Sequence, residues 1–240
     1  MIIQKDKTVA EYVSENIKTA HIFKKHGIDF CCGGSITLTK VCENKGIDYD
    51  TLEQELSNVD MTVDRSHDYN NWDLGFLIDH IINVHHKYVE ESLPILLEYS
   101  DKVAKVHGHH YSEVVEINHL VHAVAEELSL HLKKEELILF PFVKELEAAK
   151  KEGRDPSIPP FGTVNNPIRM MEHEHENAGE TFKTIAQLAN NYNPPEGACN
   201  TFRALYAMLE EFEEDLHRHI HLENNIVHRK ASILEQEMIA

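Results

Sequence analysis

The sequence of 240 residues has little positive charge, few cysteines and no long apolar run. Only 23 lysine and arginine residues stand against 41 aspartate and glutamate residues, which gives a formal net charge of −18. A protein that binds nucleic acid normally has the opposite balance, so we expect neither DNA nor RNA as a partner. The four cysteines are too few to form a disulfide scaffold in a chain of this length.

Segments that would direct the chain to or through a membrane are also missing. No stretch approaches the roughly 20 consecutive apolar residues that cross a bilayer. The first residues, 1–7, lack the apolar centre of a secretory signal. We therefore expect a cytoplasmic protein with no membrane partner. No convincing alternation of period two occurs either, and helical periodicity dominates, so the sequence predicts an all-α fold.

Histidine is the residue type that is abundant. The chain has 18 histidines, nearly as many as lysine and arginine together. Imidazole is the commonest metal-binding side chain in proteins. Most of these histidines are expected to be solvated on the surface, so those that fall on apolar helix faces are the informative ones.

The chain divides into a small helical domain, a linker and a helical bundle. Residues 1–57 form the small domain, in which a turn at 27–34 reads Gly-Ile-Asp-Phe-Cys-Cys-Gly-Gly. The polar stretch 58–71 is the predicted linker. Residues 72–240 form the bundle, and their connections predict an up-down-up-down arrangement. The four long helices are expected at roughly 72–105, 113–150, 166–191 and 198–235, with a kink at Pro94 in the first.

Helical phase separates buried from exposed histidines, because a helix turns about 100° per residue. On the second helix, His131 and Glu135 fall within the apolar face, four residues apart and on successive turns. The last helix repeats this arrangement with His219 and Glu223. On the third helix, His175 lies on the apolar face.

The first helix is less decisive. His85 and His86 straddle its apolar face, and phase mildly favours His85. Glu174 lies at the edge of the apolar face of the third helix. Four other histidines on the other three helices are phased away from the apolar faces, namely His119, His173, His217 and His221.

The combination of buried histidine and buried glutamate predicts a metal centre, because a buried carboxylate must be paired or must coordinate a cation. Four imidazoles and two carboxylates are too many for one tetrahedral zinc, although zinc remains an alternative. They divide between two metals bridged by the carboxylates, as in the di-iron and di-manganese sites of helix bundles. Mixed nitrogen and oxygen ligands suit iron better than calcium or magnesium. Such irons keep open positions for O2 or NO.

Several sequence segments resemble the bacterial iron-sulfur cluster repair proteins, a family of di-iron proteins abbreviated RIC. The resemblance covers nearly the whole chain. It includes Ile-Asp-Phe-Cys-Cys-Gly-Gly at 28–34 and His-Leu-Lys-Lys-Glu-Glu-Leu-Ile-Leu-Phe-Pro at 131–141. Met-Glu-His-Glu-His at 171–175, Pro-Glu-Gly-Ala-Cys-Asn-Thr at 195–201 and His-Ile-His-Leu-Glu-Asn-Asn at 219–225 complete it.

The resemblance implies a hemerythrin-like bundle behind a small domain that carries the Cys-Cys-Gly-Gly sequence. It also implies two non-haem irons bridged by carboxylates, with an additional oxo bridge left open. In the first helix, the family spacing selects His86 over His85. The sequence departs from the family at 226–229, where Ile-Val-His-Arg replaces the usual Leu-Phe-Pro-Arg. The implied ligands are His86, His131, Glu135, His175, His219 and Glu223.

The resemblance favours a functional role for Cys31 and Cys32, in metal or cluster contact or in reversible oxidation. If Gly33 and Gly34 lead into a helix N-terminus, the helix dipole would lower the pKa of a thiol in this turn.

Three functions remain open from the sequence. The resemblance implies repair of iron-sulfur clusters damaged by nitrosative or oxidative stress, with iron donation as the means and damaged iron-sulfur proteins as partners. An enzymatic alternative is reduction of NO to N2O by the two irons, in which Glu174 would tune a proton or iron path. The third is reversible O2 binding or sensing, against which the two His-x-x-x-Glu pairs and the cysteine domain argue. The oligomeric state is open between monomer and homodimer.

Overall fold

The computed structural model describes residue 4, residues 6–59 and residues 68–239. These residues are overwhelmingly helical, and the extended pairing among them is an isolated bridge between Thr8 and Thr37. The predicted all-α class is therefore confirmed. No helix in the described part of the chain is long and apolar enough to span a membrane. Most of the predicted linker, residues 60–67, lies outside the described residues.

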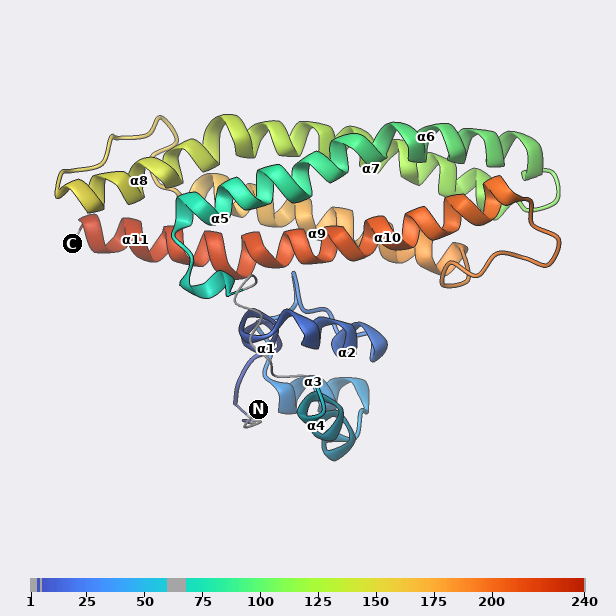
Figure 1. Ribbon diagram of the computed structural model, residues 1–240, viewed down its shortest axis with the longest axis horizontal. Coiled ribbons are helices and arrows are strands. Elements are labelled where there is room, and N and C mark those ends of the chain that lie inside the picture. The colour runs from blue at the N-terminus through green and yellow to red at the C-terminus, as the bar shows by residue number, and fades with distance from the viewer. Residues whose placement is uncertain (1–3, 5, 60–67, 240) are drawn as a thin grey trace.

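Four long helical arms form the bundle (Figure 1). We number them in chain order. The first packs against the second and the fourth, and the third packs against the same two, which closes the ring of an up-down-up-down bundle. The arms are α5 (Leu74–His80), η4 (Ile81–His86) and α6 (Lys87–His107); α7 (Glu113–Lys134), η5 (Glu135–Leu139) and α8 (Phe140–Glu152); α9 (Asn165–Leu188); and α10 (Asn200–Leu222), η6 (Glu223–His228) and α11 (Arg229–Ile239).

Three of the four arms change from α-helix to π-helix near the middle of the bundle. The π segments are η4, η5 and η6. A π turn takes up an extra residue and therefore shifts the phase of every side chain that follows it. The irregularity in the first arm lies at η4, and α6 stays α-helical across Pro94. The kink predicted at Pro94 stays a prediction.

Two apolar clusters fill the bundle. One includes Val89, Leu132 and Leu216 and continues into the N-terminal domain, and the other includes Ile81 and Leu139. Along each arm, the predicted ligands fall between residues of the first cluster and residues of the second. The candidate site is therefore a buried polar layer with apolar packing on both sides.

The N-terminal domain consists of short helices: α1 (Val9–Glu15), η1 (Ile17–Thr19), α2 (Ala20–Lys25), α3 (Leu38–Lys45) and α4 (Tyr49–Ser57). Thr8 and Glu11 form a capping box at the start of α1, in which each side chain binds the backbone N–H of the other residue. Gly27, at φ 61°, follows α2 and starts the Cys-Cys-Gly-Gly turn.

This domain packs against the fourth arm (Figure 1). The Phe30 ring contacts His217 and His221 edge-on, with ring centroids 6.0 Å apart in each case. Ser14 Oγ lies 3.3 Å from His221 Nε2. Neither histidine belongs to a group of potential metal ligands, and the N-terminal domain contacts both. Burial lowers the pKa of His221 to about 4, so its imidazole is neutral near pH 7.

Candidate metal centre

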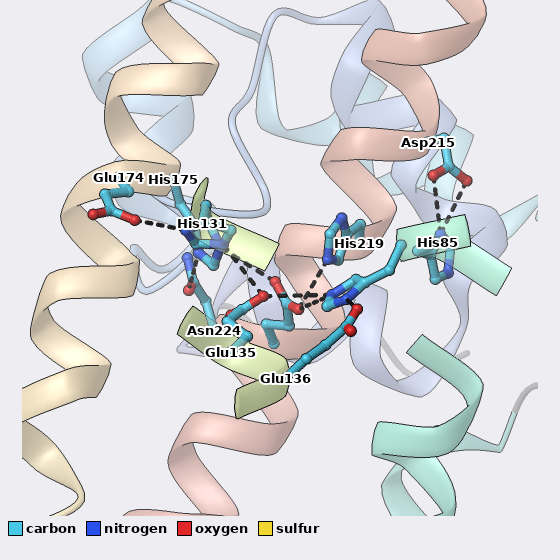
Figure 2. Close-up of polar contacts among 11 residues, drawn as sticks. His85, His131, Glu135, Glu136, Glu174, His175, Asp215, His219 and Asn224 are labelled. Atoms are coloured by element: carbon cyan, nitrogen blue, oxygen red, sulfur yellow. Dashed lines mark hydrogen bonds and ion pairs between the residues drawn. The ribbon is translucent and has the colours of Figure 1, made fainter. Parts of the chain in front are cut away.

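The six predicted ligands come together in the middle of the bundle (Figure 2). They form two overlapping groups that share Glu135 and Glu223. His86 and His219 complete the first group, and His131 and His175 complete the second. Within each group the potential ligand atoms lie within 4.8 Å of one another. None of the six residues is more than 2% exposed.

Glu223 is placed between the two histidine pairs. Its Oε1 lies 2.9 Å from His219 Nε2 and 3.4 Å from His86 Nε2. Its Oε2 lies 3.2 Å from His175 Nε2. One carboxylate oxygen thus faces His86 and His219 and the other faces His175 of the second pair, which is the geometry of a carboxylate that can bridge two cations.

Glu135 also lies between the pairs. Its Oε2 is 3.3 Å from His131 Nε2 and 3.4 Å from His86 Nε2. Neither of its oxygens has a hydrogen-bond partner among the described residues, although the side chain is fully buried. A buried carboxylate in this state needs positive charge beside it. The donor set of two imidazoles and two shared carboxylates on each side fits a pair of divalent metal ions.

Three of the four histidines are oriented by a hydrogen-bond acceptor behind the ring (Figure 2). The Nδ1 atoms of His86, His131 and His175 lie 2.7–2.8 Å from acceptor oxygens, so each Nδ1–H is donated outward and each Nε2 faces the centre. Metal-binding histidines usually have such partners. The acceptors are Glu136 Oε1, Glu174 Oε2 and Asn224 Oδ1, respectively.

Sequence reasoning singled out Glu174 but missed Glu136 and Asn224. A signal for them was present, because each follows a predicted carboxylate ligand directly in the sequence. His219 has no such partner for its Nδ1 among the described residues. Instead its ring stacks on His85, with centroids 5.7 Å apart, and His85 Nδ1 binds Asp215 at 3.0 Å. His85 is therefore buried beside the centre without joining either group.

The electrostatics of the site favour positive charge. Burial alone would lower the pKa of His86, but its contacts with Glu135 and Glu223 outweigh burial and raise this pKa to about 10. Burial would likewise lower the pKa of His131, but the contacts of this histidine, mainly with Glu135, raise its pKa to about 9. Burial and the charge of Glu223 would raise the pKa of Glu135, yet the histidines hold it at about 2. Burial would raise the pKa of Glu223 as well, but the neighbouring histidines hold it well below its usual value. Both carboxylates are thus anionic near pH 7, and metal ions would replace the protons on His86 and His131.

The condition for a low thiol pKa at the cysteine pair is not met, and the pKa of Cys31 is raised instead. The turn does not lead into a helix, since α3 begins only at Leu38. The Asp29 carboxylate accepts backbone N–H bonds from Cys31, Cys32 and Gly33 at 2.8–3.0 Å, and it accepts the Cys31 thiol at 3.2 Å. The neighbouring Cys32 thiol, burial and the Asp29 charge all raise the pKa of Cys31 well above its usual value. The Cys31 side chain is therefore a thiol at neutral pH.

The cysteine pair lies at a pocket between the N-terminal domain and the bundle. This interdomain pocket, of about 510 Å³, is lined by Cys31 and Cys32 on one side and by Glu172, Asn224 and Arg229 on the other. The Asn224 amide nitrogen is 4.0 Å from Cys32 Sγ, and its Oδ1 is the acceptor for a metal-centre histidine. A single side chain thus separates the pocket from the centre.

A pair of His/Glu groups inside a four-helix bundle defines a class of hemerythrin-like cation-binding proteins. Comparison with known families agrees, because the family described as hemerythrin HHE cation binding domain matches residues 77–231. A second family, described as a domain of unknown function (DUF542), matches residues 5–60.

Similarity to curated proteins identifies the family more closely. The chain is 38% identical over 210 residues to the iron-sulfur cluster repair protein YtfE of Yersinia pseudotuberculosis serotype IB, covering 88% of this chain and 89% of that protein. It is 37% identical over 214 residues to the protein of the same name from Yersinia pestis strain Pestoides F, covering 89% and 91%. The chain belongs to the iron-sulfur cluster repair protein family.

Proposed function

We propose that the protein holds two iron ions between the four histidines and two glutamates and donates iron to damaged iron-sulfur clusters. The observation that carries this proposal is the pair of fully buried carboxylates, Glu135 and Glu223, each shared by two imidazole pairs. One ion would bind His86 and His219, and the other would bind His131 and His175.

The donor chemistry supports iron over other common ions. Calcium and magnesium prefer shells made only of oxygen, whereas this site offers as many nitrogens as carboxylate residues on each side. A structural zinc is usually closed by four ligands in a tetrahedron, often with thiolates, and no cysteine takes part in either group. Non-haem iron accepts imidazole and carboxylate together and keeps positions open for exchange.

Cluster repair is supported by the relatives, which carry that function in their names. Donation requires that the bound ion can be released, and Glu174 is a partly exposed group in contact with one of the ligands. Glu174 binds the outer nitrogen of His131 and is also ion-paired with Lys134, with 27% of its side chain exposed. A movement of Glu174 would shift the His131 ring and thereby favour release of the ion that His131 binds.

Cys31 and Cys32 would act at the interdomain pocket. We propose that their thiols contact the departing ion or the damaged cluster of the client protein. The activity would take place in the cytoplasm, with oxidatively or nitrosatively damaged iron-sulfur proteins as the clients.

The test combines iron content with transfer of labelled iron. Protein loaded with ⁵⁷Fe is mixed with an iron-sulfur dehydratase damaged by NO, and Mössbauer spectroscopy follows the label into the client cluster while client activity is measured. We expect about two irons per chain and recovery of client activity with ⁵⁷Fe in the cluster. Glu135→Ala removes a shared ligand, so it is expected to lose most of the iron and all of the transfer.

The matched control is Glu127→Ala, which removes an exposed carboxylate from α7 in the same arm. It is expected to keep the iron and the transfer activity. Repair of the client at full rate by iron-free Glu135→Ala would contradict the proposal. Recovery of the client with unlabelled iron alone would contradict donation while leaving the metal centre intact.

A further inference from the structure

His228 is a buried histidine that the proposed centre does not use. It is the last residue of η6 and is only 1% exposed. Neither Nδ1 nor Nε2 makes a hydrogen bond to any described residue. Leaving a buried polar group without a partner is unfavourable, so such a group calls for a bound water, an ion or a ligand.

The surroundings of His228 lead from the metal centre toward the interdomain pocket. Its ring stacks parallel to that of His175, with centroids 6.1 Å apart and planes 5° apart. Its Nδ1 lies 3.9 Å from Oε1 of Glu172, which is within ion-pairing distance for a protonated imidazole but too far for a hydrogen bond. Glu172 is half-buried and lines the interdomain pocket together with Cys32. An imidazole and a carboxylate thus meet between the pocket and a ligand of the centre.

We propose that His228 and Glu172 form a third metal site, which takes a divalent cation such as Fe²⁺. Two ligands at about 2.1 Å from one ion are about 3.0 Å apart when adjacent and about 4.2 Å apart when opposite. The observed separation of 3.9 Å falls inside this range, so the pair can close on an ion with a small side-chain rotation. Water molecules would supply the remaining ligands.

A site with one imidazole and one carboxylate from the protein binds an ion weakly, which suits a cation in transit. The stacked arrangement puts this ion next to His175 on one side and next to the pocket that holds the cysteine pair on the other. The site would load the paired centre or receive iron from it. This role rests on the proposed function, whereas the existence of the third site does not.

The test counts metal ions with Co²⁺ as the probe. The protein is stripped with a chelator and titrated with Co²⁺, and bound metal is measured by equilibrium dialysis and visible absorption. We expect wild type to bind two ions tightly and a third at least about 10-fold more weakly. His228→Gln and Glu172→Gln are each expected to lose only the third ion. Glu172 is half-buried, so its variant keeps the test valid if the buried substitution impairs folding.

The matched control is His173→Gln, since His173 adjoins Glu172 in α9 and its side chain is 72% exposed. It is expected to retain all three ions. Binding of only two ions by wild type, or retention of the third by folded His228→Gln or Glu172→Gln, would overturn the third site. Failure of the wild-type protein to bind two ions tightly would instead contradict the paired centre.

A kinetic measurement separates transit from mere binding. In stopped-flow mixing with Co²⁺, His228→Gln is expected to fill the paired centre about 10-fold more slowly than wild type while reaching the same final content. Equal filling rates would overturn the transit role.

Discussion

Glu174 Oε2 lies 2.8 Å from Nδ1 of His131, so the carboxylate accepts the N–H that points away from the metal centre (Figure 2). This bond fixes the ring orientation that directs Nε2 inward. The carboxylate contacts His131 without belonging to either ligand group. Its contribution to metal binding can therefore be measured separately from that of the ligands.

Replacing Glu174 with leucine is expected to weaken iron binding about 10- to 100-fold, because His131 loses its orienting acceptor. Competition with a chromophoric chelator measures the affinity. Glu174→Gln should recover part of it, since an amide oxygen can still accept the bond. Glu180→Leu serves as the control, because the Glu180 side chain is 73% exposed on the same helix. Unchanged affinity in Glu174→Leu would show that His131 is oriented by its packing alone.

The metal-free protein is expected to lose stability as pH rises from about 6.5 to about 10. The pKa of His86 is raised from 6.5 to about 10 in the folded protein, so its contribution is complete below 6.5 and is lost as pH rises through 10. His131, at about 9, acts in the same direction. Urea unfolding of the chelator-treated protein at several pH values measures this effect.

Bound metal should reverse this pH dependence, because coordination requires deprotonated imidazole and releases its protons. The Glu135→Gln, Glu223→Gln double variant provides the comparison. It lacks the charges that raise the histidine pKa values, so its stability should vary less over the same range. A metal-free wild type whose stability rose steadily from pH 6.5 to 10 would contradict the protonated imidazoles.

Gly34→Ala is expected to destabilise the N-terminal domain. A Cβ at this position would lie 2.4 Å from the Phe30 carbonyl oxygen and 2.8 Å from the Ala10 Cβ, and the backbone atom cannot rotate away. Overpacking of this kind typically costs about 1–3 kcal/mol. Limited proteolysis of the N-terminal domain would detect it. Gly179→Ala, which meets no atom within 4 Å, should be neutral or slightly stabilising.

Asn225→Ala is expected to loosen the contact between the two domains while leaving the iron content unchanged. The Asn225 amide donates to the backbone carbonyls of Cys31 at 3.0 Å and Phe30 at 3.4 Å. Each such bond contributes about 1 kcal/mol. Hydrogen exchange should therefore become faster in residues 28–34. Asn118→Ala, whose amide binds within the bundle to Ser100 and Asp101, should leave this exchange unchanged.

Much of the bundle follows from the sequence because helical periodicity is a local property. The four arms lie within a few residues of their predicted bounds, and phase alone selected five of the six residues that meet in the centre. Phase was ambiguous at His85 and His86, because η4 adds a residue to the turn just there and both side chains become buried. A pattern read at 100° per residue does not contain this shift.

Features that depend on contacts between residues far apart in the chain could not be predicted from the sequence. The burial of His221, and the contact of Phe30 with both His217 and His221, require the N-terminal domain to pack on α10, far along the chain. The raised pKa of Cys31 depends on the way Asp29 folds back over the turn, which leaves the thiol beside a carboxylate rather than a helix dipole. Neither relationship has a periodic signal, so both had to come from the three-dimensional structure.

If two cations occupy the centre as proposed, the two carboxylates that both groups share would make the occupancy of its halves interdependent. If one of two cations departs, the other keeps the attraction of both glutamates and no longer experiences repulsion from its neighbour. The ion that remains would then be held more strongly than either was before. Such a protein would release one ion at a time and would keep the second ion tightly bound, so that the empty position could be refilled.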